Sequence, residues 1–299
     1  MNQNKAIVTR KPTKKEIYAS FGIEFDGTYI YCEPLKIKMR PVLKNGNNKI
    51  GRGVYQLSLT AGNAPVSDDV LKNVVKNIMD EFTAEKMDEL KAVCGGTCGF
   101  RCKDCYGLVG HYVRNNVATC LARHTYLATY ALEWLENAIN AQIAADHIEY
   151  LRIHVTGDMK SREYAEMWLR IIRANRNTCF WTYTKQYGRG FDDVLDAIDS
   201  EENANIVKSF TDTGKINFGP AGYIIELYKD LVARGKSVWI CKCGVDKNQH
   251  CNGCHHCFTS EYVLFLLHSC KEYNPKKDPR YDEFVALVNS QIETEEQAV

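Results

Sequence analysis

Extended and helical segments alternate regularly along the second half of the chain. Four segments with the composition of β-strands, residues 149–158, 178–185, 203–210 and 237–244, are separated by three with the apolar spacing of α-helices, residues 161–175, 190–200 and 220–235. Ser161 can cap the first of these helices, and Gly235 can end the last. Strands that alternate with helices usually pair in parallel and are joined by crossover helices. The sequence therefore predicts an α/β protein with a mostly parallel sheet.

The remaining elements are expected on either side of this alternation. They are strands at residues 27–34, 35–41 and 53–62, helices at residues 66–82, 113–145 and 279–297, and a strand or a buried helix at residues 261–270. In parallel sheets ligands bind beyond the carboxyl ends of the strands. The residues to inspect there are Gly62, the stretches 156–158 and 183–185, and Cys241.

Thirteen cysteines are unusual in a chain that has neither the small size nor the apolar N-terminal segment of a secreted, disulfide-rich domain. Cys32, Cys120, Cys179 and Cys270 are isolated, and we expect them to be small buried hydrophobic residues. The other nine are grouped as metal ligands are. The first cysteine cluster comprises Cys94, Cys98, Cys102 and Cys105, and the second comprises Cys241, Cys243, Cys251, Cys254 and Cys257.

In the first cysteine cluster, three residues separate Cys98 from Cys102 and two separate Cys102 from Cys105. Three thiolates can bind a [4Fe–4S] cluster and leave one iron without a protein ligand, where S-adenosylmethionine can chelate. Cys94 precedes Cys98 by four positions and can close the cluster, which would give a structural or electron-transfer centre. Zinc is the alternative, bound by the pairs Cys94–Cys98 and Cys102–Cys105, although these pairs are close together for a zinc site.

The second cysteine cluster has the compact spacing of bacterial-ferredoxin loops, with two residues between Cys251 and Cys254 and two between Cys254 and Cys257. Cys241 or Cys243 can supply the fourth thiolate. This pattern indicates a fully ligated auxiliary [4Fe–4S] cluster. Zinc is again an alternative, with spare ligands at His250, His255 and His256.

The spacing of the first cysteine cluster resembles the signature of the radical S-adenosylmethionine superfamily. In that superfamily a Gly-rich turn after the second strand meets the amino group of the cofactor. By this resemblance Gly157 and Asp158 are candidate cofactor contacts, and Tyr183 and Lys185, which end the next strand, are further candidates. We expect His154 to be a hydrogen-bonded core residue.

Several stretches together resemble the phage protein family called gene product 88. They are residues 51–62, 98–107, 151–185 and 241–257, and the resemblance extends from residue 51 to residue 268. It implies a radical-SAM-like, partial (β/α) barrel of mostly parallel strands with a C-terminal cysteine-rich extension. The implied division is an N-terminal strand-rich segment (1–50), the barrel (51–240) with its cluster loop (94–107), and the extension with a closing helix (241–299). The helical segment 66–92 is an insertion relative to the family pattern.

The expected function is that of an iron–sulfur protein, most simply a radical S-adenosylmethionine enzyme with two clusters. Such an enzyme needs an electron donor such as a flavodoxin or a ferredoxin, and a substrate that the sequence does not identify. The alternatives are a closed iron–sulfur protein for redox sensing or electron transfer, and a zinc-stabilised binding module.

Charge and hydropathy restrict the partners. Lys and Arg total 38 and Asp and Glu total 37, so the net charge of +1 gives no indication of a nucleic-acid-binding face. The most apolar stretch, which starts at Tyr262, is too short to span a bilayer. We therefore expect a cytoplasmic protein, in the host cell if the chain is encoded by a phage.

Overall fold

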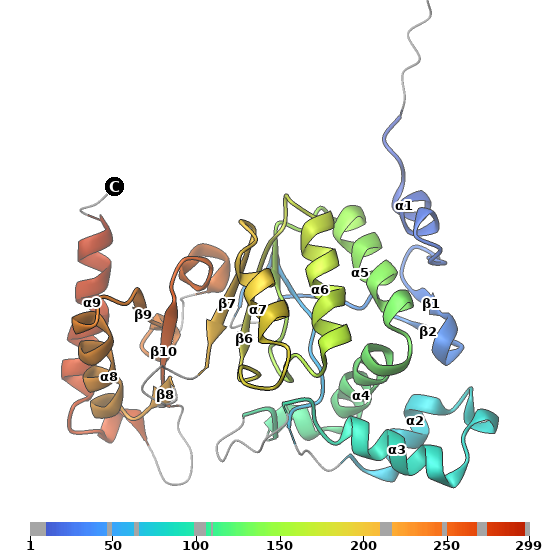
Figure 1. The fold of residues 1–299 in the computed structure, drawn as a ribbon, viewed down its shortest axis with the longest axis horizontal. Coiled ribbons are helices and arrows are strands. Elements are labelled where there is room, and N and C mark those ends of the chain that lie inside the picture. The colour runs from blue at the N-terminus through green and yellow to red at the C-terminus, as the bar shows by residue number, and fades with distance from the viewer. Residues whose placement is uncertain are drawn as a thin grey trace, which may run out of the picture.

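The fold is built on a five-stranded, mostly parallel sheet (Figure 1). The structure is a computed structural model that describes residues 10–46, 50–62, 66–98, 106–108, 110–209, 217–246, 250–267 and 274–296. The strands run in the order β3 (Lys44–Asn45), β4 (Val54–Gln56), β5 (Tyr150–Arg152), β6 (Cys179–Thr184) and β7 (Ala204–Lys208). Only β3 is antiparallel to its neighbour, and β4 to β7 pair in parallel. The prediction of an α/β protein with a mostly parallel sheet is therefore confirmed.

Three helices, α5 (Leu132–Asp146), α6 (Arg162–Ala174) and α7 (Asp192–Asp199), cover one face of this sheet (Figure 1). Helix α6 begins as predicted, because the Ser161 hydroxyl accepts a hydrogen bond from the Tyr164 amide at 3.3 Å. Its buried side chains, which include Trp168 and Ile171, recur every three or four positions and face the sheet. The amphipathic pattern of the sequence thus produces the main core.

The connection from β4 to β5 contains most of the remaining helices. It forms α2 (Asp68–Val75), α3 (Ala84–Cys94), α4 (Asn115–Tyr130) and then α5. The single helix expected over residues 113–145 is wrong, because Ala131 leaves the helical conformation with φ −145° and ψ 48°. The break lets α4 pack against α2 and α3 while α5 packs against α6. Cys120, expected to be buried, is exposed on α4.

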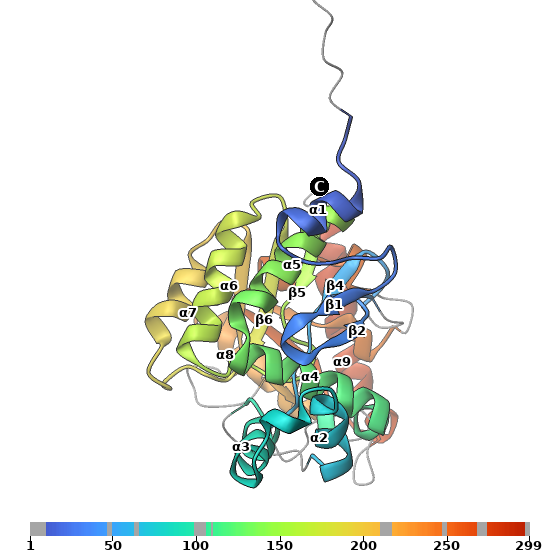
Figure 2. The same cartoon turned by 90° about the vertical axis from the view of Figure 1, so that its right-hand side faces the viewer.

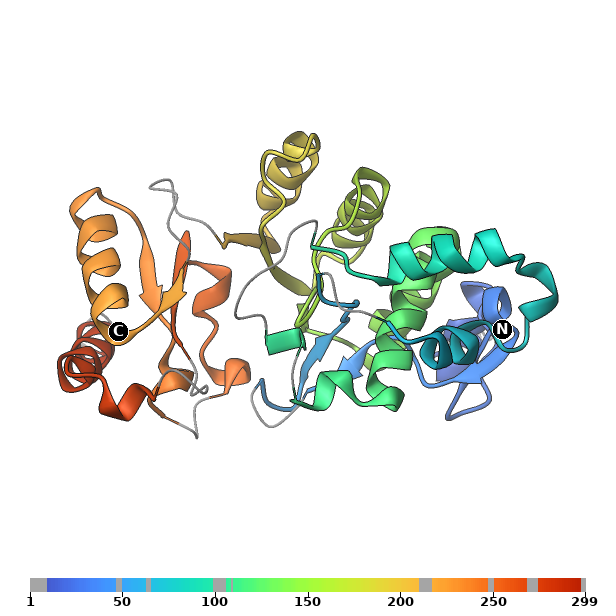
Figure 3. The same cartoon turned by 90° about the horizontal axis from the view of Figure 1, so that it is seen from below.

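A second sheet of three parallel strands lies beyond β7 (Figure 1). Its order is β8 (Phe218–Gly219), β10 (Tyr262–Leu266) and β9 (Val238–Ile240), so residues 262–266 form a strand and not a helix. Helices α8 (Ala221–Ala233) and α9 (Tyr281–Glu296) form an apolar core with these strands. Figure 3 shows this unit at one end of the molecule and the N-terminal elements at the other.

The N-terminal elements pack beside α5 (Figure 2). They are α1 (Lys14–Ser20) and an antiparallel pair, β1 (Ile30–Cys32) and β2 (Ile37–Met39). Helix α1 was not predicted, although its capping box can be recognised in the sequence: the Thr13 hydroxyl accepts from the Glu16 amide, and the Glu16 carboxylate accepts from the Thr13 amide at 2.8 Å. Among the described helices, none is both long enough and apolar enough to cross a membrane.

Candidate functional site

Residues 97–107, which include Cys98, Cys102 and Cys105, are called the first cysteine loop. Both ends of this loop lie against the carboxyl ends of β4 and β5. At the leading end, the Thr97 hydroxyl donates to the Thr60 carbonyl at 2.9 Å and accepts from the Asp158 amide at 3.0 Å. At the trailing end, Gly107 lies so close to the sheet that a Cβ there would be 2.7 Å from the Cβ of Ala61 and 3.2 Å from Thr156 Cγ2. The chain therefore leaves and rejoins the sheet edge where ligands of parallel sheets bind.

Three of the four residues of the first cysteine cluster belong to this loop. Cys98 follows Thr97 directly and is 9% exposed. Cys102 and Cys105 lie outside the described residues. The insertion 66–92 thus does not carry the start of the loop away from the sheet edge, because Thr97 is hydrogen-bonded there.

Cys94 is positioned differently from Cys98. It is the last residue of α3, is fully buried in the main hydrophobic core, and its Sγ lies 3.7 Å from the Ala122 carbonyl oxygen, to which it donates. Burial raises the pKa of the Cys94 thiol to about 12. A neutral thiol that packs in an apolar core is a structural residue in character.

Gly157 and Asp158 lie at the same edge, at the turn after β5. Gly157 has φ +82°, and a Cβ there would be 2.7 Å from Leu59 Cβ and 2.8 Å from Thr97 Oγ1. The buried Asp158 carboxylate accepts from the Thr184 hydroxyl at 2.7 Å, from the Lys185 amide at 2.9 Å and from the Met159 amide at 2.8 Å. Burial nevertheless raises the pKa of Asp158 to about 6. Both carboxylate oxygens therefore join the end of β5 to the end of β6.

Tyr183 and Lys185, the other predicted cofactor contacts, have side chains that also contact the second cysteine cluster and the second sheet. The Tyr183 hydroxyl is 2.7 Å from Cys257 Sγ, in the second cysteine cluster. The Lys185 ammonium lies 5.5 Å from the centre of the Phe218 ring, at the start of the second sheet. His154 is buried as expected, and its Nε2 is 3.0 Å from the Tyr164 hydroxyl.

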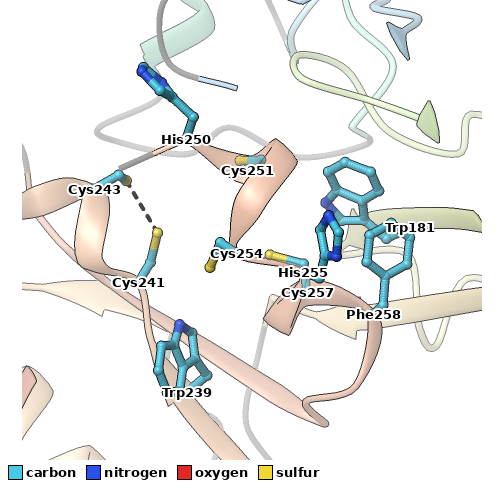
Figure 4. Close-up of a pocket in the computed structure, with 10 residues that line it drawn as sticks. All are labelled: Trp181, Trp239, Cys241, Cys243, His250, Cys251, Cys254, His255, Cys257 and Phe258. Atoms are coloured by element: carbon cyan, nitrogen blue, oxygen red, sulfur yellow. Dashed lines mark hydrogen bonds between the residues drawn. The ribbon is translucent and has the colours of Figure 1, made fainter. Parts of the chain in front are cut away.

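The second cysteine cluster lines one pocket (Figure 4). Strand β9 ends at Ile240 and delivers Cys241 and Cys243, whose sulfur atoms are 3.2 Å apart. Cys251, Cys254 and Cys257 follow on short 3-10 turns, and Figure 4 shows all five sulfur atoms directed toward a common space. Burial raises the pKa of the Cys257 thiol to about 12. The spacing in the sequence thus identified a group of cysteines that the fold does bring together.

Aromatic and amide side chains hold the loop of the second cysteine cluster against the face of the main sheet that α5, α6 and α7 do not cover. The Asn205 amide group on β7 donates to the Cys257 carbonyl at 2.6 Å and to the Ser260 carbonyl at 3.3 Å. The Phe258 ring lies 4.6 Å from Trp181 on β6. Neither Asn205 nor Trp181 was predicted from the sequence; the alternation of Trp181 with Tyr183 along the strand is the sign that both face the same side.

The histidines of this loop are engaged with aromatic rings. His255 stacks on Tyr150 at 4.4 Å and His256 on Trp239 at 3.6 Å, both measured between ring centres. In Figure 4 the His250 ring points away from the sulfur atoms. The five thiols are therefore the candidate ligands that face one another across the pocket.

Two observations bear on whether the second cysteine cluster fits a metal centre. Across the described ranges, no three His, Cys, Asp or Glu side chains are arranged to hold one metal ion. A tetrahedral zinc ion needs sulfur atoms about 3.8 Å apart, whereas each thiolate of a [4Fe–4S] cluster binds a different iron and the sulfur atoms are more widely spaced. Thiolate donors suit zinc and iron–sulfur clusters alike. Because the sulfur atoms of Cys241 and Cys243 are 3.2 Å apart, only one of these two fits among the four ligands of a [4Fe–4S] cluster.

The second observation is a pair of indole N–H groups. Trp181 and Trp239 line the pocket and are 2% and 5% exposed, and within the described part of the chain neither indole nitrogen has a hydrogen-bond acceptor. In Figure 4 the nitrogen of Trp239 faces the sulfur atoms. Buried donors are almost always satisfied in folded proteins. Bridging sulfides of a bound cluster would provide such acceptors.

A family model described as gene product 88 matches residues 41–268. No curated protein matches the chain, and no solved structure does.

Proposed function

The chain belongs to the gene product 88 family, and we propose that it is a radical S-adenosylmethionine-type iron–sulfur protein. In this proposal Cys98, Cys102 and Cys105 bind a [4Fe–4S] cluster with one open iron. The second cysteine cluster binds an auxiliary [4Fe–4S] cluster, and strands β4 to β7 form the wall of a partial (β/α) barrel. The observation that carries the proposal is the contrast between Cys94, which is buried in the core, and Cys98, which is next to the sheet edge.

That contrast supports an open first cluster over a closed one. If Cys94 stays in its core position, its thiol is committed to the Ala122 carbonyl and is not available to iron. Three cysteines then remain on a loop whose ends are fixed by Thr97 and Gly107 at the carboxyl edge. A cluster held by Cys98, Cys102 and Cys105 would supply reducing electrons for the cleavage of bound S-adenosylmethionine.

The chain's own residues would prepare the site for that chemistry. Gly157 allows the backbone to approach Thr97 closely, and the hydrogen bonds of Asp158 fix the ends of β5 and β6 next to it. The loop of the second cysteine cluster packs on Tyr150 and Trp181 and covers part of the sheet from water. A low-potential donor such as a flavodoxin or a ferredoxin would supply electrons, in the cytoplasm of a host cell.

The test is the iron, sulfide and zinc content of anaerobically purified protein and of two matched cysteine variants. We expect about eight irons per chain, four for each cluster, in the native protein. Cys94→Ala should retain about eight, whereas Cys98→Ala should retain about four. Loss of half the iron in Cys94→Ala would instead indicate a closed first cluster, and zinc without iron would refute the proposal.

A further inference from the structure

An exposed cysteine on α4 faces a buried histidine one helical turn further on. Cys120 is exposed, whereas His124 is only 7% exposed. Residues four apart lie on the same face of a helix, and here Cys120 Sγ is 3.9 Å from His124 Nε2. This pair is separate from both cysteine clusters.

The backbone of the sheet fixes which nitrogen of His124 can act on the thiol. His124 Nδ1 lies 3.0 Å from the carbonyl oxygen of Ser58, just beyond β4. A carbonyl oxygen can only accept, so Nδ1 carries the hydrogen. In the neutral ring Nε2 then presents its lone pair to Cys120 Sγ, as in a cysteine nucleophile activated by an oriented base.

The charged groups around Cys120 favour its thiolate form. His124 lowers the pKa of Cys120 most, and Arg123 on α4 and Lys44 on β3 act in the same direction, so that the pKa is about 7. The thiolate in turn raises the pKa of His124. The buried thiols Cys32 and Cys94 behave in the opposite way, because burial raises the pKa of each to about 12.

We propose that Cys120 is a reactive thiol that exchanges with low-molecular-weight disulfides, with His124 as its base. Cys120 Sγ passes its proton to His124 Nε2 and attacks one sulfur of the disulfide. A mixed disulfide forms at Cys120, the original S–S bond breaks, and its electron pair leaves on the second sulfur, which takes the proton back from His124. A reducing thiol such as glutathione reverses the step.

The chain offers an internal comparison for the experiment. Trypsin releases residues 115–123 and 177–185 as peptides with one cysteine each, Cys120 and Cys179. Cys179 is half-buried on β6, and burial raises the pKa of its thiol. Mass spectrometry of these two peptides therefore compares the candidate with a control in the same molecule.

The measurement is the rate of Cys120 modification in the full-length protein by iodoacetamide and by glutathione disulfide, from pH 5.5 to pH 9.5. We expect a rate midpoint near pH 7, and a rate at pH 7 at least threefold that of Cys179. Unfolding in urea should move the midpoint to about 8.5, the ordinary value for a cysteine. This comparison needs no variant and therefore does not depend on one that folds.

The variant His124→Gln tests the base directly. Its midpoint should rise by at least one pH unit, while the reactivity of Cys179 stays as in the native protein. A midpoint that is the same in native, urea-unfolded and variant protein would overturn the proposal. So would a Cys120 that reacts no faster than Cys179 at pH 7.

Discussion

Gly157 shows how one residue determines the geometry of the first site. Its φ of +82° is costly for residues with a Cβ, and the space for a Cβ is already taken by Leu59 and Thr97. Thr97 in turn precedes Cys98. A change at Gly157 is therefore transmitted directly to the leading end of the cysteine loop.

A matched pair of glycine variants separates backbone strain from crowding. Gly188 has φ +79°, nearly the same as Gly157, but a Cβ there would have no neighbour within 4 Å among the described residues. We expect Gly188→Ala to cost about 1 kcal/mol of unfolding free energy and Gly157→Ala about 2–4 kcal/mol. Chemical denaturation measures both. Equal costs would show that the contact with Leu59 and Thr97 does not matter.

At the scale of elements, Asp158 joins the ends of two neighbouring strands. Its carboxylate accepts from Thr184 and Lys185, which end β6, although Asp158 itself follows β5. Burial raises its pKa to about 6, above the ordinary value of about 3.9 in an unfolded chain. Between these values the folded protein holds a proton that the unfolded chain has lost, so stability falls as the pH rises through this window.

The variant Asp158→Asn removes this titration. The unfolding free energy of the native protein, taken relative to that of Asp158→Asn, should therefore fall by roughly 2 kcal/mol between pH 4 and pH 7. Denaturant titrations of both proteins at several pH values measure this difference. A difference that does not vary with pH would contradict the assignment of the raised pKa to Asp158.

Much of the element order could be predicted because its signals are local. Alternation of apolar residues marked β5, β6 and β7, and Ser161 and Gly235 marked the ends of helices as found. The break at Ala131 has no Gly or Pro to announce it. The pairing of β9 with β10 depends on contacts between residues distant in the sequence, which local patterns do not encode.

The candidate site likewise has residues that local sequence patterns could predict and residues whose positions depend on contacts distant in the sequence. Cysteine spacing predicted that Cys241, Cys251, Cys254 and Cys257 gather, because residues on one loop that are close in the chain are close in space. The indole of Trp239 and the amide of Asn205 could not be assigned from the sequence, since their positions depend on how two sheets meet. The core position of Cys94 likewise depends on α3 packing against α4.

At the scale of the whole molecule, the second cysteine cluster lies where the two sheets meet. Val207 on β7 packs with Trp239 and Val263 of the second sheet, and Cys241 and Cys257 lie against this group. Asn217 links the sheets, since its side chain donates to the Lys208 carbonyl at 3.1 Å and to the Val263 carbonyl at 2.9 Å. The geometry of the pocket therefore depends on the junction between the sheets.

Replacing Asn217 tests that dependence. Asn217→Ala leaves two carbonyl groups without this donor and should cost about 2–4 kcal/mol of unfolding free energy. The exposed Asn177 is a suitable control, and Asn177→Ala should cost less than about 0.5 kcal/mol. Chemical denaturation compares the two variants. A similar, small cost in both would show that Asn217 does not hold the sheets together.

The central claim, an open iron in the first cluster, is tested most directly by electron paramagnetic resonance of anaerobically reduced protein with and without S-adenosylmethionine. The proposal predicts a spectrum that changes when S-adenosylmethionine is added, in the native protein and in Cys94→Ala, and no such change in Cys98→Ala. Two reduced clusters whose spectrum is the same with and without S-adenosylmethionine would contradict it.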